Sequence, residues 1–310
     1  MMPLNTLLFI IGLILLYAGG EVFIKGSTSI AYLFGLRPLI VAATVAAFAT
    51  SAPEFVVCLT AAVRNSRNLA LGNIIGSCIA NIALILGICS LIRPINIERS
   101  LLRKELPILI VVSVSFFLIC LNLYISKAEA FLLLFGFCLF IYYCVKNAKQ
   151  EKNALIESRY QSKLKSFVFI GLATLLLVSG SNLLVKSAVA LANYFGISQL
   201  VIGLTIVAVG TSLPELSVSA VASARGKHET AIGNVIGSNI FNILLIIGAI
   251  CLVRPIFISP ATIRFEIPLM VAYSILLLPL LRTGFKLSRL EGFILLLSYA
   301  VYIWILFNRR

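Results

Sequence analysis

The sequence contains no aspartate, and charged residues of either sign are scarce. All 11 acidic residues are glutamate, and charged residues make up 12% of the 310 positions, whereas 61% are hydrophobic. Soluble domains carry about a quarter charged residues and about half apolar ones. A chain this poor in charge, with a mean hydropathy of +1.09, cannot hide its apolar surface in water. The composition therefore excludes a soluble enzyme, a nucleic-acid-binding domain and a disordered chain, although the net charge is +14.

The sequence also has few residues suited to a resident metal site. The only histidine, His228, falls in a predicted loop, so a histidine-based zinc site is not expected. The seven cysteines all lie in apolar stretches and none forms a Cys-x-x-Cys pair, so we interpret them as small packing residues.

Long apolar runs dominate the chain. A helix needs about 20 apolar residues to cross a bilayer core of roughly 30 Å, and the runs found here are too long and too continuously apolar for barrel strands. The first run has no basic flank and no cleavage site, so we expect a retained helix. The sequence thus predicts an all-α, multi-pass protein of the cell membrane. Its ten transmembrane helices are expected at 4–33, 38–63, 70–92, 106–124, 128–145, 167–194, 198–223, 231–253, 265–282 and 288–308.

Lysine and arginine are distributed unevenly between the two sets of loops. If both termini face outward, the inside loops hold more than twice as many basic residues as the outside loops. The positive-inside bias therefore predicts that the N and C termini both lie outside. We interpret the excess positive charge as a topology signal and as contact with anionic lipid headgroups, not as a nucleic-acid surface.

The two halves of the chain repeat each other at a constant offset of 161 residues. The register is kept from Gly19 and Gly180 to Pro107 and Pro268, which indicates a duplication. Each half holds five predicted spans, an odd number, so the second half must be inverted relative to the first. Inverted repeats are typical of secondary transporters, whose binding site lies near the midplane where the repeats meet. The predicted domains are a first five-helix repeat at 1–145, a cytoplasmic linker at 146–166 and a second five-helix repeat at 167–310.

Two glutamates lie inside apolar spans. Glu54 and Glu215 end matching stretches, residues 47–54 and 208–215. An ionised carboxylate near the bilayer centre costs on the order of 3 kcal/mol, so it usually faces a cavity, a partner or an ion. No basic residue within the spans is placed to neutralise both glutamates. We therefore expect these carboxylates to bind cations.

A proline precedes each of these glutamates. Proline has no N–H, and its ring displaces the carbonyl about one turn earlier. Pro53 is therefore predicted to free carbonyls at residues 49–50, and Pro214 at residues 210–211. Each helix break would offer backbone oxygens, two hydroxyls and a carboxylate within one turn. An oxygen-only ligand set suits hard cations such as Na⁺ and Ca²⁺.

A stretch rich in glycine, asparagine and serine also occurs in both halves. In each copy a serine and an asparagine stand four positions apart and share one helix face, as Ser77 with Asn81 and Ser238 with Asn242. The glycines let that face approach another backbone closely. The hydroxyl and amide oxygens can complete a cation shell without adding charge.

Structural roles are open for several of these polar residues. A proline-kinked helix with threonine and serine is common in membrane proteins, and Asn73 and Asn234 could either ligate a cation or satisfy the backbone of a broken helix. Glu21 and Lys25 are four residues apart and are expected to form a local pair. The cation role is favoured for the midspan glutamates because a carboxylate, a predicted helix break and a helix face with serine and asparagine occur at matching positions in both halves.

The repeated motifs resemble the two signatures of the sodium/calcium exchanger family, prokaryotic type, within the wider calcium/cation antiporter superfamily. The resemblance covers nearly the whole chain, and two linked signatures are far more specific than either alone. The residues that carry it are Thr50-Ser51-Ala52-Pro53-Glu54 with Gly72-Asn73, Gly76-Ser77 and Asn81, and Thr211-Ser212-Leu213-Pro214-Glu215 with Gly233-Asn234, Gly237-Ser238 and Asn242.

This resemblance implies four cation sites clustered between spans 2, 3, 7 and 8. Calcium would lie between Glu54 and Glu215, together with the carbonyls of Thr50 and Thr211. In the family, spans 1 and 6 slide across a rigid core to alternate access, which fits their greater length here. The remaining ligands would be Asn81 and Asn242 at the middle position and, for sodium, Ala47, Thr50, Ser51, Ser77, Ala208, Thr211, Ser212 and Ser238 with the two glutamates.

Two positions depart from the family pattern. Ala49 stands where the family usually has glycine, as Gly210 does in the second half, and its methyl group is expected to tighten the first break. Asn242 stands where related prokaryotic exchangers often have aspartate, so the site holds two carboxylates rather than three. Animal exchangers of the family also use asparagine at both positions. Exchange is therefore still expected, and Asn242 argues against potassium dependence.

These features predict a secondary antiporter, not an enzyme, that exchanges Na⁺ for Ca²⁺ by alternating access, electrogenically and at about three to one by family resemblance. No cofactor is expected; the partners are the transported Na⁺ and Ca²⁺ and the lipid bilayer, and the chain is expected to be monomeric. A proton/calcium exchanger, or one for another divalent cation, would use the same carboxylates. A passive cation channel is a second alternative, and a scaffold without transport gives no reason for buried carboxylates.

Overall fold

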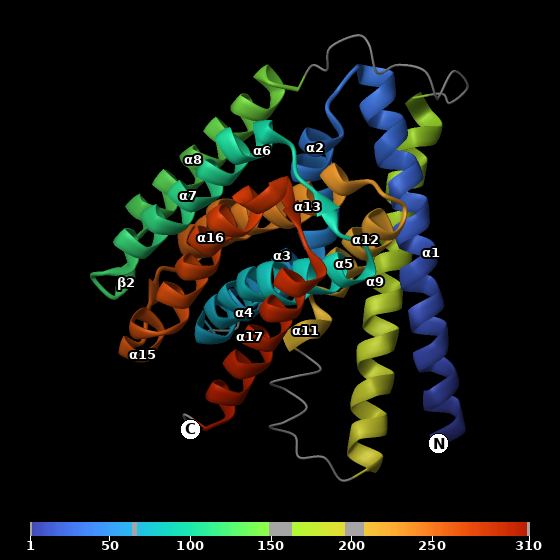
Figure 1. Ribbon diagram of the computed structural model, residues 1–310. Coiled ribbons are helices and arrows are strands. Elements are labelled where there is room, and N and C mark those ends of the chain that lie inside the picture. The colour runs from blue at the N-terminus through green and yellow to red at the C-terminus, as the bar shows by residue number, and fades with distance from the viewer. Residues whose placement is uncertain (1, 64–66, 149–162, 196–207, 309–310) are drawn as a thin grey trace.

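The computed structural model describes residues 2–63, 67–148, 163–195 and 208–308, and these residues are almost entirely helical (Figure 1). Eight helical segments among them are long and apolar enough to cross a membrane. The all-α, multi-pass membrane fold predicted from hydropathy is therefore confirmed for the described part of the chain.

The first half forms a series of apolar helices joined by short connections. In lipid each backbone must satisfy its own hydrogen bonds, which favours such continuous helices. The elements are α1 (Met2–Phe34), α2 (Pro38–Val41), the π-helical η1 (Ala42–Ala46), α3 (Ala47–Val63), α4 (Arg67–Ala80), the π-helical η2 (Asn81–Ile85), α5 (Leu86–Ile92), α6 (Arg99–Arg103), α7 (Glu105–Cys120) and α8 (Lys127–Lys146).

The second half follows the same order of elements. Its elements are α9 (Lys163–Tyr194), α11 (Ala208–Gly210), α12 (Leu213–Ala224), α13 (His228–Ile240), the π-helical η5 (Phe241–Ile246), α14 (Ile247–Val253), α15 (Pro260–Arg264), α16 (Glu266–Arg282), the short 3₁₀ segment η6 (Thr283–Phe285) and α17 (Arg289–Asn308).

Most predicted spans coincide with these helices, and the second, predicted at 38–63, is found in full. The fourth, predicted at 106–124, is shorter, because α7 ends at Cys120 and Leu123 adopts a positive φ of 60°. The seventh, predicted at 198–223, lies partly outside the described residues. The total of ten spans stays a prediction.

Four two-residue strands connect the two halves. β1 (Ile95–Asn96) pairs antiparallel with β4 (Lys286–Leu287), and β2 (Tyr124–Ile125) pairs antiparallel with β3 (Ile256–Phe257). In each pair, one strand follows a buried helix of one half and the other precedes the last helix of the other half. Each half is thus hydrogen-bonded to the other in the same way.

The last helix of each half begins with a capping box. Ser126 accepts from the Glu129 N–H and Glu129 accepts from the Ser126 N–H, and Ser288 and Glu291 make the same two bonds before α17. A capping box satisfies two backbone N–H groups that a helix start otherwise leaves unpaired. Both helices therefore begin directly after a strand.

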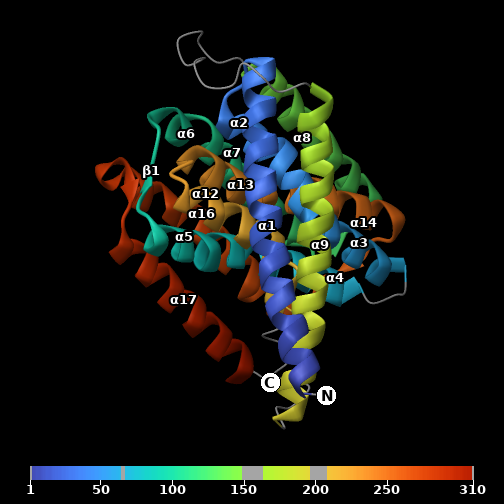
Figure 2. The same ribbon diagram turned by 90° about the vertical axis from the view of Figure 1, so that its right-hand side faces the viewer.

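Helices α1 and α9 lie side by side along one face of the molecule and run in opposite directions (Figures 1 and 2). They are the longest described helices, with 33 and 32 residues. Where they touch, a Cβ atom added at Gly12 would come within 2.9 Å of Leu184 N, and one added at Gly180 within 2.9 Å of Leu16 N. Small residues let helix backbones approach this closely.

The described chain begins and ends at the same end of the molecule. Figure 1 shows α1 starting and α17 finishing there, whereas α8 finishes and α9 starts at the opposite end. The identity of the end that faces outside stays a prediction.

Candidate functional site

The two glutamates predicted to bind cations lie deep inside the molecule. Glu54 comes from α3 and Glu215 from the first turn of α12, and their exposed fractions are 1% and 0%. Helices α4 and α13 pack against these two helices and carry the second motif of each half. The four helices thus bring both motifs of both halves to one place.

Each carboxylate accepts a hydrogen bond from the other half of the chain. Ser51 Oγ donates to Glu215 Oε1 at 2.9 Å, and Ser212 Oγ donates to Glu54 Oε1 at 3.1 Å. These two bonds are related by the repeat offset, so the same contact is made twice with the halves exchanged. The serine three positions before each glutamate therefore orients the carboxylate of the opposite half.

The second oxygen of each carboxylate is buried and has no hydrogen-bond partner. This holds for Glu54 Oε2 and for Glu215 Oε2, and the two carboxyl groups are direct neighbours. Among the described residues, the ion pairs involve other glutamates and none reaches this pair. Two adjacent buried negative charges are strongly unfavourable unless a positive charge lies between them. The arrangement therefore favours binding of a cation.

Asn73 and Asn234 link the two halves through their side chains. Thr50 Oγ1 donates to Asn234 Oδ1 at 3.3 Å, and Thr211 Oγ1 donates to Asn73 Oδ1 at 3.3 Å. Each amide nitrogen in turn donates to a side chain of the preceding helix in its own half. These contacts give both asparagines a positioning role, and each amide oxygen keeps a second lone pair that a cation could use.

Further polar atoms of the second motif in each half are buried and have no hydrogen-bond partner. They are Asn81 Oδ1, Ser238 Oγ and both amide atoms of Asn242. Asn81 begins η2 and Asn242 is the second residue of η5. Such π-helical turns are frequent at functional sites. An unpartnered buried polar group costs about 1–3 kcal/mol, so the concentration of such oxygens here points to a ligand with affinity for hard oxygen donors.

The remaining predicted ligands are placed with different detail. Ser77 Oγ lies 3.2 Å from Ser212 Oγ and so belongs to the same cluster. Ala47 is fully buried at the start of α3 and can offer only its backbone oxygen. Ala208 begins α11, and its side-chain surroundings lie outside what the structure describes.

The two prolines shape their helices differently, contrary to the expectation of a break at each. Helix α3 continues through Pro53, whereas the chain is interrupted between α11 and α12, just before Pro214. In the first half, the hydrogen bond lost at Pro53 does not by itself end the helix. In the second half, Gly210 stands where the first half has Ala49, and glycine has the lower helix propensity, so the helix is interrupted there. The carbonyl of Gly210, left free by the proline, accepts a hydrogen bond from Ser181 Oγ of α9 at 2.7 Å.

Asn239 is a buried site residue that the comparison of the two halves did not single out. Its Nδ2 donates to the carbonyl oxygen of Cys78 at 3.1 Å, and its Oδ1 accepts from Asn81 Nδ2 at 2.9 Å. Cys78 occupies the matching position of the first half, so a search for identical pairs could not find Asn239. The available signal was a second polar residue beside Ser238 in an apolar span.

Glu21 pairs with the second half of the chain rather than with Lys25. Arg225 Nη2 lies 2.7 Å from Glu21 Oε1, and Arg225 Nε donates to the same oxygen at 2.8 Å. The expected local pair is wrong because α1 packs against α12 and brings the forked guanidinium to the carboxylate.

Comparison with known proteins identifies close relatives along the entire chain. The family described as sodium/calcium exchanger protein matches residues 4–146 and 165–308. The putative antiporter CaxA of Alkalimonas amylolytica is 38% identical, with 99% of this chain and 100% of that protein covered. The sodium/calcium exchanger MaX1 of Methanosarcina acetivorans is 30% identical, with 99% of each chain covered.

The fold is also that of a solved membrane exchanger. The structure of the sodium-calcium exchanger NCX_Mj soaked with zero Na⁺ and Ca²⁺ has a TM-score of 0.86 at 32% identity, with 99% of this chain and 100% of that chain covered. The likeness in sequence and in fold extends over both halves and includes both repeated motifs. The chain therefore belongs to the sodium/calcium exchanger family, as a multi-pass membrane protein of the prokaryotic type.

Proposed function

We propose that this protein is a secondary antiporter that exchanges Na⁺ for Ca²⁺ by alternating access. The observation that carries the proposal is the pair of adjacent, fully buried carboxylates of Glu54 and Glu215, each with one oxygen that lacks a hydrogen-bond partner. A relative that aligns end to end is named as a sodium/calcium exchanger, which supports the same ions for this chain.

Ca²⁺ binds between the two glutamates in this proposal. Their unpartnered oxygens and the backbone carbonyls of Thr50 and Thr211 make an oxygen shell of the kind that Ca²⁺ accepts. Asn81 and Asn242 line the space between them, and the three Na⁺ ions take neighbouring positions. The Na⁺ ligands in this proposal are Glu54, Glu215, Ala47, Thr50, Ser51, Ser77, Ala208, Thr211, Ser212 and Ser238.

Charge balance gives the coupling between the two ions. Glu54 and Glu215 together neutralise one Ca²⁺, whereas three Na⁺ leave the site with one positive charge. Without any cation, two ionised carboxylates would have to cross the apolar core, which is costly. The loaded site therefore changes its access more readily than the empty one, and exchange at about three Na⁺ to one Ca²⁺ is electrogenic.

The architecture that we propose is two inverted five-helix repeats, residues 1–145 and 167–310, joined by a cytoplasmic linker at 146–166, with ten spans and both termini outside. The opposite directions of α1 and α9 support the inversion (Figure 2). The strand pairs and the serine–glutamate bonds support it as well, because each joins one half to the other in a reciprocal way.

The test is ⁴⁵Ca²⁺ uptake into Na⁺-loaded liposomes that contain the purified protein, with the membrane potential clamped. Glu54→Gln and Glu215→Gln are each expected to lower the initial rate about a hundredfold or more, because removing one of two buried charges from a cation site costs several kcal/mol. Glu129→Gln is the matched control, since glutamine also completes a capping box. Normal uptake by either site variant would refute the proposal.

A proton/calcium exchanger is the alternative that the geometry supports most, because two neighbouring carboxyl groups can also share a proton. Such a protein would take up ⁴⁵Ca²⁺ in response to a pH gradient and would not respond to Na⁺ inside the liposomes. Uptake that requires neither Na⁺ nor protons on the other side would instead indicate a passive cation channel.

A further inference from the structure

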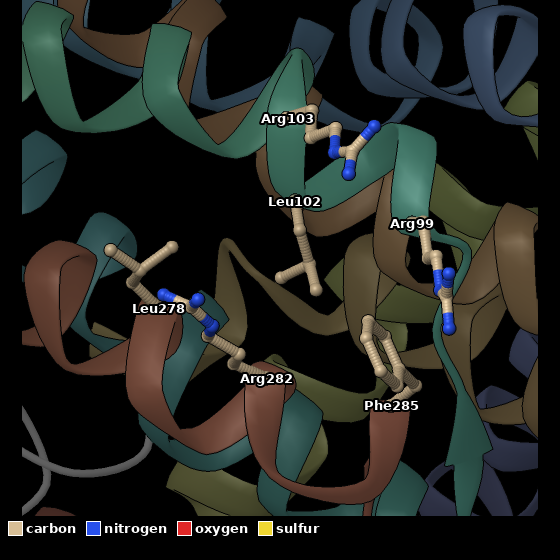
Figure 3. A pocket seen from close by; sticks show the side chains of 6 residues that line it. All are labelled: Arg99, Leu102, Arg103, Leu278, Arg282 and Phe285. Carbon is tan, nitrogen blue, oxygen red and sulfur yellow. The ribbon is translucent and has the colours of Figure 1, made fainter.

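A second group of charged residues lies away from the ion site. Residues from α6, from the end of α16 and from η6 line a cavity of about 450 Å³ (Figure 3). A separate cavity, lined by other residues at α6, reaches Lys146 at the end of α8, so α6 lies at the end of the molecule where the first half finishes. The residues that line the larger cavity are Arg99, Leu102, Arg103, Leu278, Arg282 and Phe285.

The three arginines of this cavity are exposed. Within the described residues, none of these three arginines takes part in an ion pair. The Arg99 guanidinium is held 4.9 Å from the centre of the Phe285 ring. Figure 3 shows the three arginine side chains around the cavity, with Leu102 and Phe285 directed between them.

The wall of the cavity is apolar. Leu102 and Leu278 are half-buried, and Phe285 keeps 38% of its surface exposed. Helix α16 also presents exposed apolar side chains one turn before Leu278, at Ile275 and Leu276. Guanidinium groups above an apolar wall match a ligand with an anionic head and a hydrocarbon tail.

The other half of the chain supplies an internal comparison. Helix α15 repeats α6 at the offset of 161 residues, and Arg103 corresponds to Arg264. The other two positions are not basic there, because Arg99 corresponds to Pro260 and Arg282 to Leu121. The same helix is therefore built without the additional arginines, so the fold itself does not require them.

We propose that this cavity binds an anionic phospholipid. The phosphate is held by the guanidinium groups of Arg99, Arg103 and Arg282, because the planar guanidinium forms paired hydrogen bonds with phosphate oxygens. The acyl chain lies along Leu102 and Leu278. Basic pockets between transmembrane helices bind anionic headgroups in this way. A soluble phosphate would use the same guanidinium groups but would leave the apolar wall uncovered.

The test is native mass spectrometry of the full chain, released from micelles that contain either phosphatidylglycerol or phosphatidylcholine. The wild-type chain is expected to retain one phosphatidylglycerol and no phosphatidylcholine. Arg99→Gln with Arg282→Gln is expected to weaken retention about tenfold or more. The matched control is Lys127→Gln with Arg264→Gln, which removes the same charge from exposed positions at the start of α8 and the end of α15 and is expected to leave retention unchanged.

Three results would overturn the proposal. Equal loss of phosphatidylglycerol in the control pair would mean that general surface charge holds the lipid. Equal retention of phosphatidylcholine would mean that the cavity does not select a headgroup with a net negative charge. Displacement of phosphatidylglycerol by millimolar inorganic phosphate would identify a soluble anion as the ligand. The comparisons between lipids and with phosphate use the wild-type chain, so they decide the question even if the double variant does not fold.

Discussion

At the scale of single residues, the proposed ion site combines carboxylate oxygens held by hydrogen bonds with carboxylate oxygens that have no partner. Ser51 and Ser212 each hold one oxygen of a carboxylate, while the second oxygen of Glu54 and of Glu215 has no partner. Each unpartnered buried atom lowers stability by about 1–3 kcal/mol. A bound cation removes this penalty. In the proposed function, the atoms that weaken the ion-free protein are therefore the ones that bind the cation.

Substitutions of Asn242 and Asn239 are expected to have different effects: the first should lower ion uptake and the second should lower stability. Asn242→Ala removes two unpartnered buried atoms, which favours stability, and leaves a small cavity, which opposes it, so the Tm should hardly change, while ⁴⁵Ca²⁺ uptake should fall about tenfold because a ligand is lost. Asn239→Ala breaks two bonds between the halves and should lower the unfolding free energy by about 2–4 kcal/mol. Thermal unfolding and uptake of both variants check this. A large loss of Tm for Asn242→Ala would show that its role is structural.

Ser181 is expected to stabilise the interrupted seventh span. Ser181→Ala leaves the buried carbonyl of Gly210 without a partner, which should lower the unfolding free energy by about 1–3 kcal/mol. Thr174→Ala is the control on the same helix, because Thr174 bonds only to Ile170 one turn earlier. Denaturation in detergent measures both. Equal stability of the two variants would contradict a role for this hydrogen bond.

At the scale of helices, the contact between α1 and α9 depends on glycine. Both helices are largely apolar and neither gathers its polar residues on one side, so their pairing does not come from an amphipathic pattern. It comes from small residues that allow backbone contact, as at Gly12 and Gly180.

Gly180→Ala is expected to disturb this contact. The added methyl group would lie within 3.0 Å of backbone atoms of α1, and such overpacking costs about 1–3 kcal/mol. Gly171→Ala is the control, because its Cβ would meet no atom within 4 Å and alanine favours a helix by up to about 1 kcal/mol. The two Tm values should therefore move in opposite directions. A lower Tm for Gly171→Ala alone would refute the packing explanation.

At the scale of the whole molecule, the two halves are interlocked. Ser113 Oγ lies 3.0 Å from Ser274 Oγ, and these residues differ by the repeat offset of 161. A residue touches its own counterpart only near an axis that relates the two halves. The strand pairs and the threonine–asparagine bonds are arranged in the same reciprocal way. Neither half alone contains all the residues of the proposed ion site.

Two separately expressed halves are therefore expected to assemble. Residues 1–148 and 163–310, produced together, should copurify through an affinity tag on one of them and should show Na⁺-dependent ⁴⁵Ca²⁺ uptake. Each half produced alone should aggregate, because it exposes buried carboxylate, amide and hydroxyl groups to lipid. A first half that is monodisperse by itself, and does not bind the second, would contradict the interlocked arrangement.

Local sequence predicted the site better than it predicted long-range partners. The matched motifs located Glu54 and Glu215, and the structure places both in one buried cluster. The pair of Glu21 with Lys25 was wrong because Arg225, far away in the sequence, comes closer. Comparing the two halves at the offset of 161 reveals only positions with the same residue. Asn239 corresponds to Cys78, so its role could not be predicted in this way.

The sequence by itself determined the membrane fold, the duplication and the family, because hydropathy and repeated motifs are properties of the chain that need no partner. The tertiary structure decided the pairing between the halves. It showed that the serine and the threonine of each glutamate motif donate hydrogen bonds to the opposite half. It also showed that Ser181 of α9 donates to the Gly210 carbonyl freed by Pro214, and that three arginines surround an apolar wall. The physical reason is that hydrogen bonds and close contacts depend on which helices are neighbours. In an apolar chain without amphipathic faces, only the packed structure shows that.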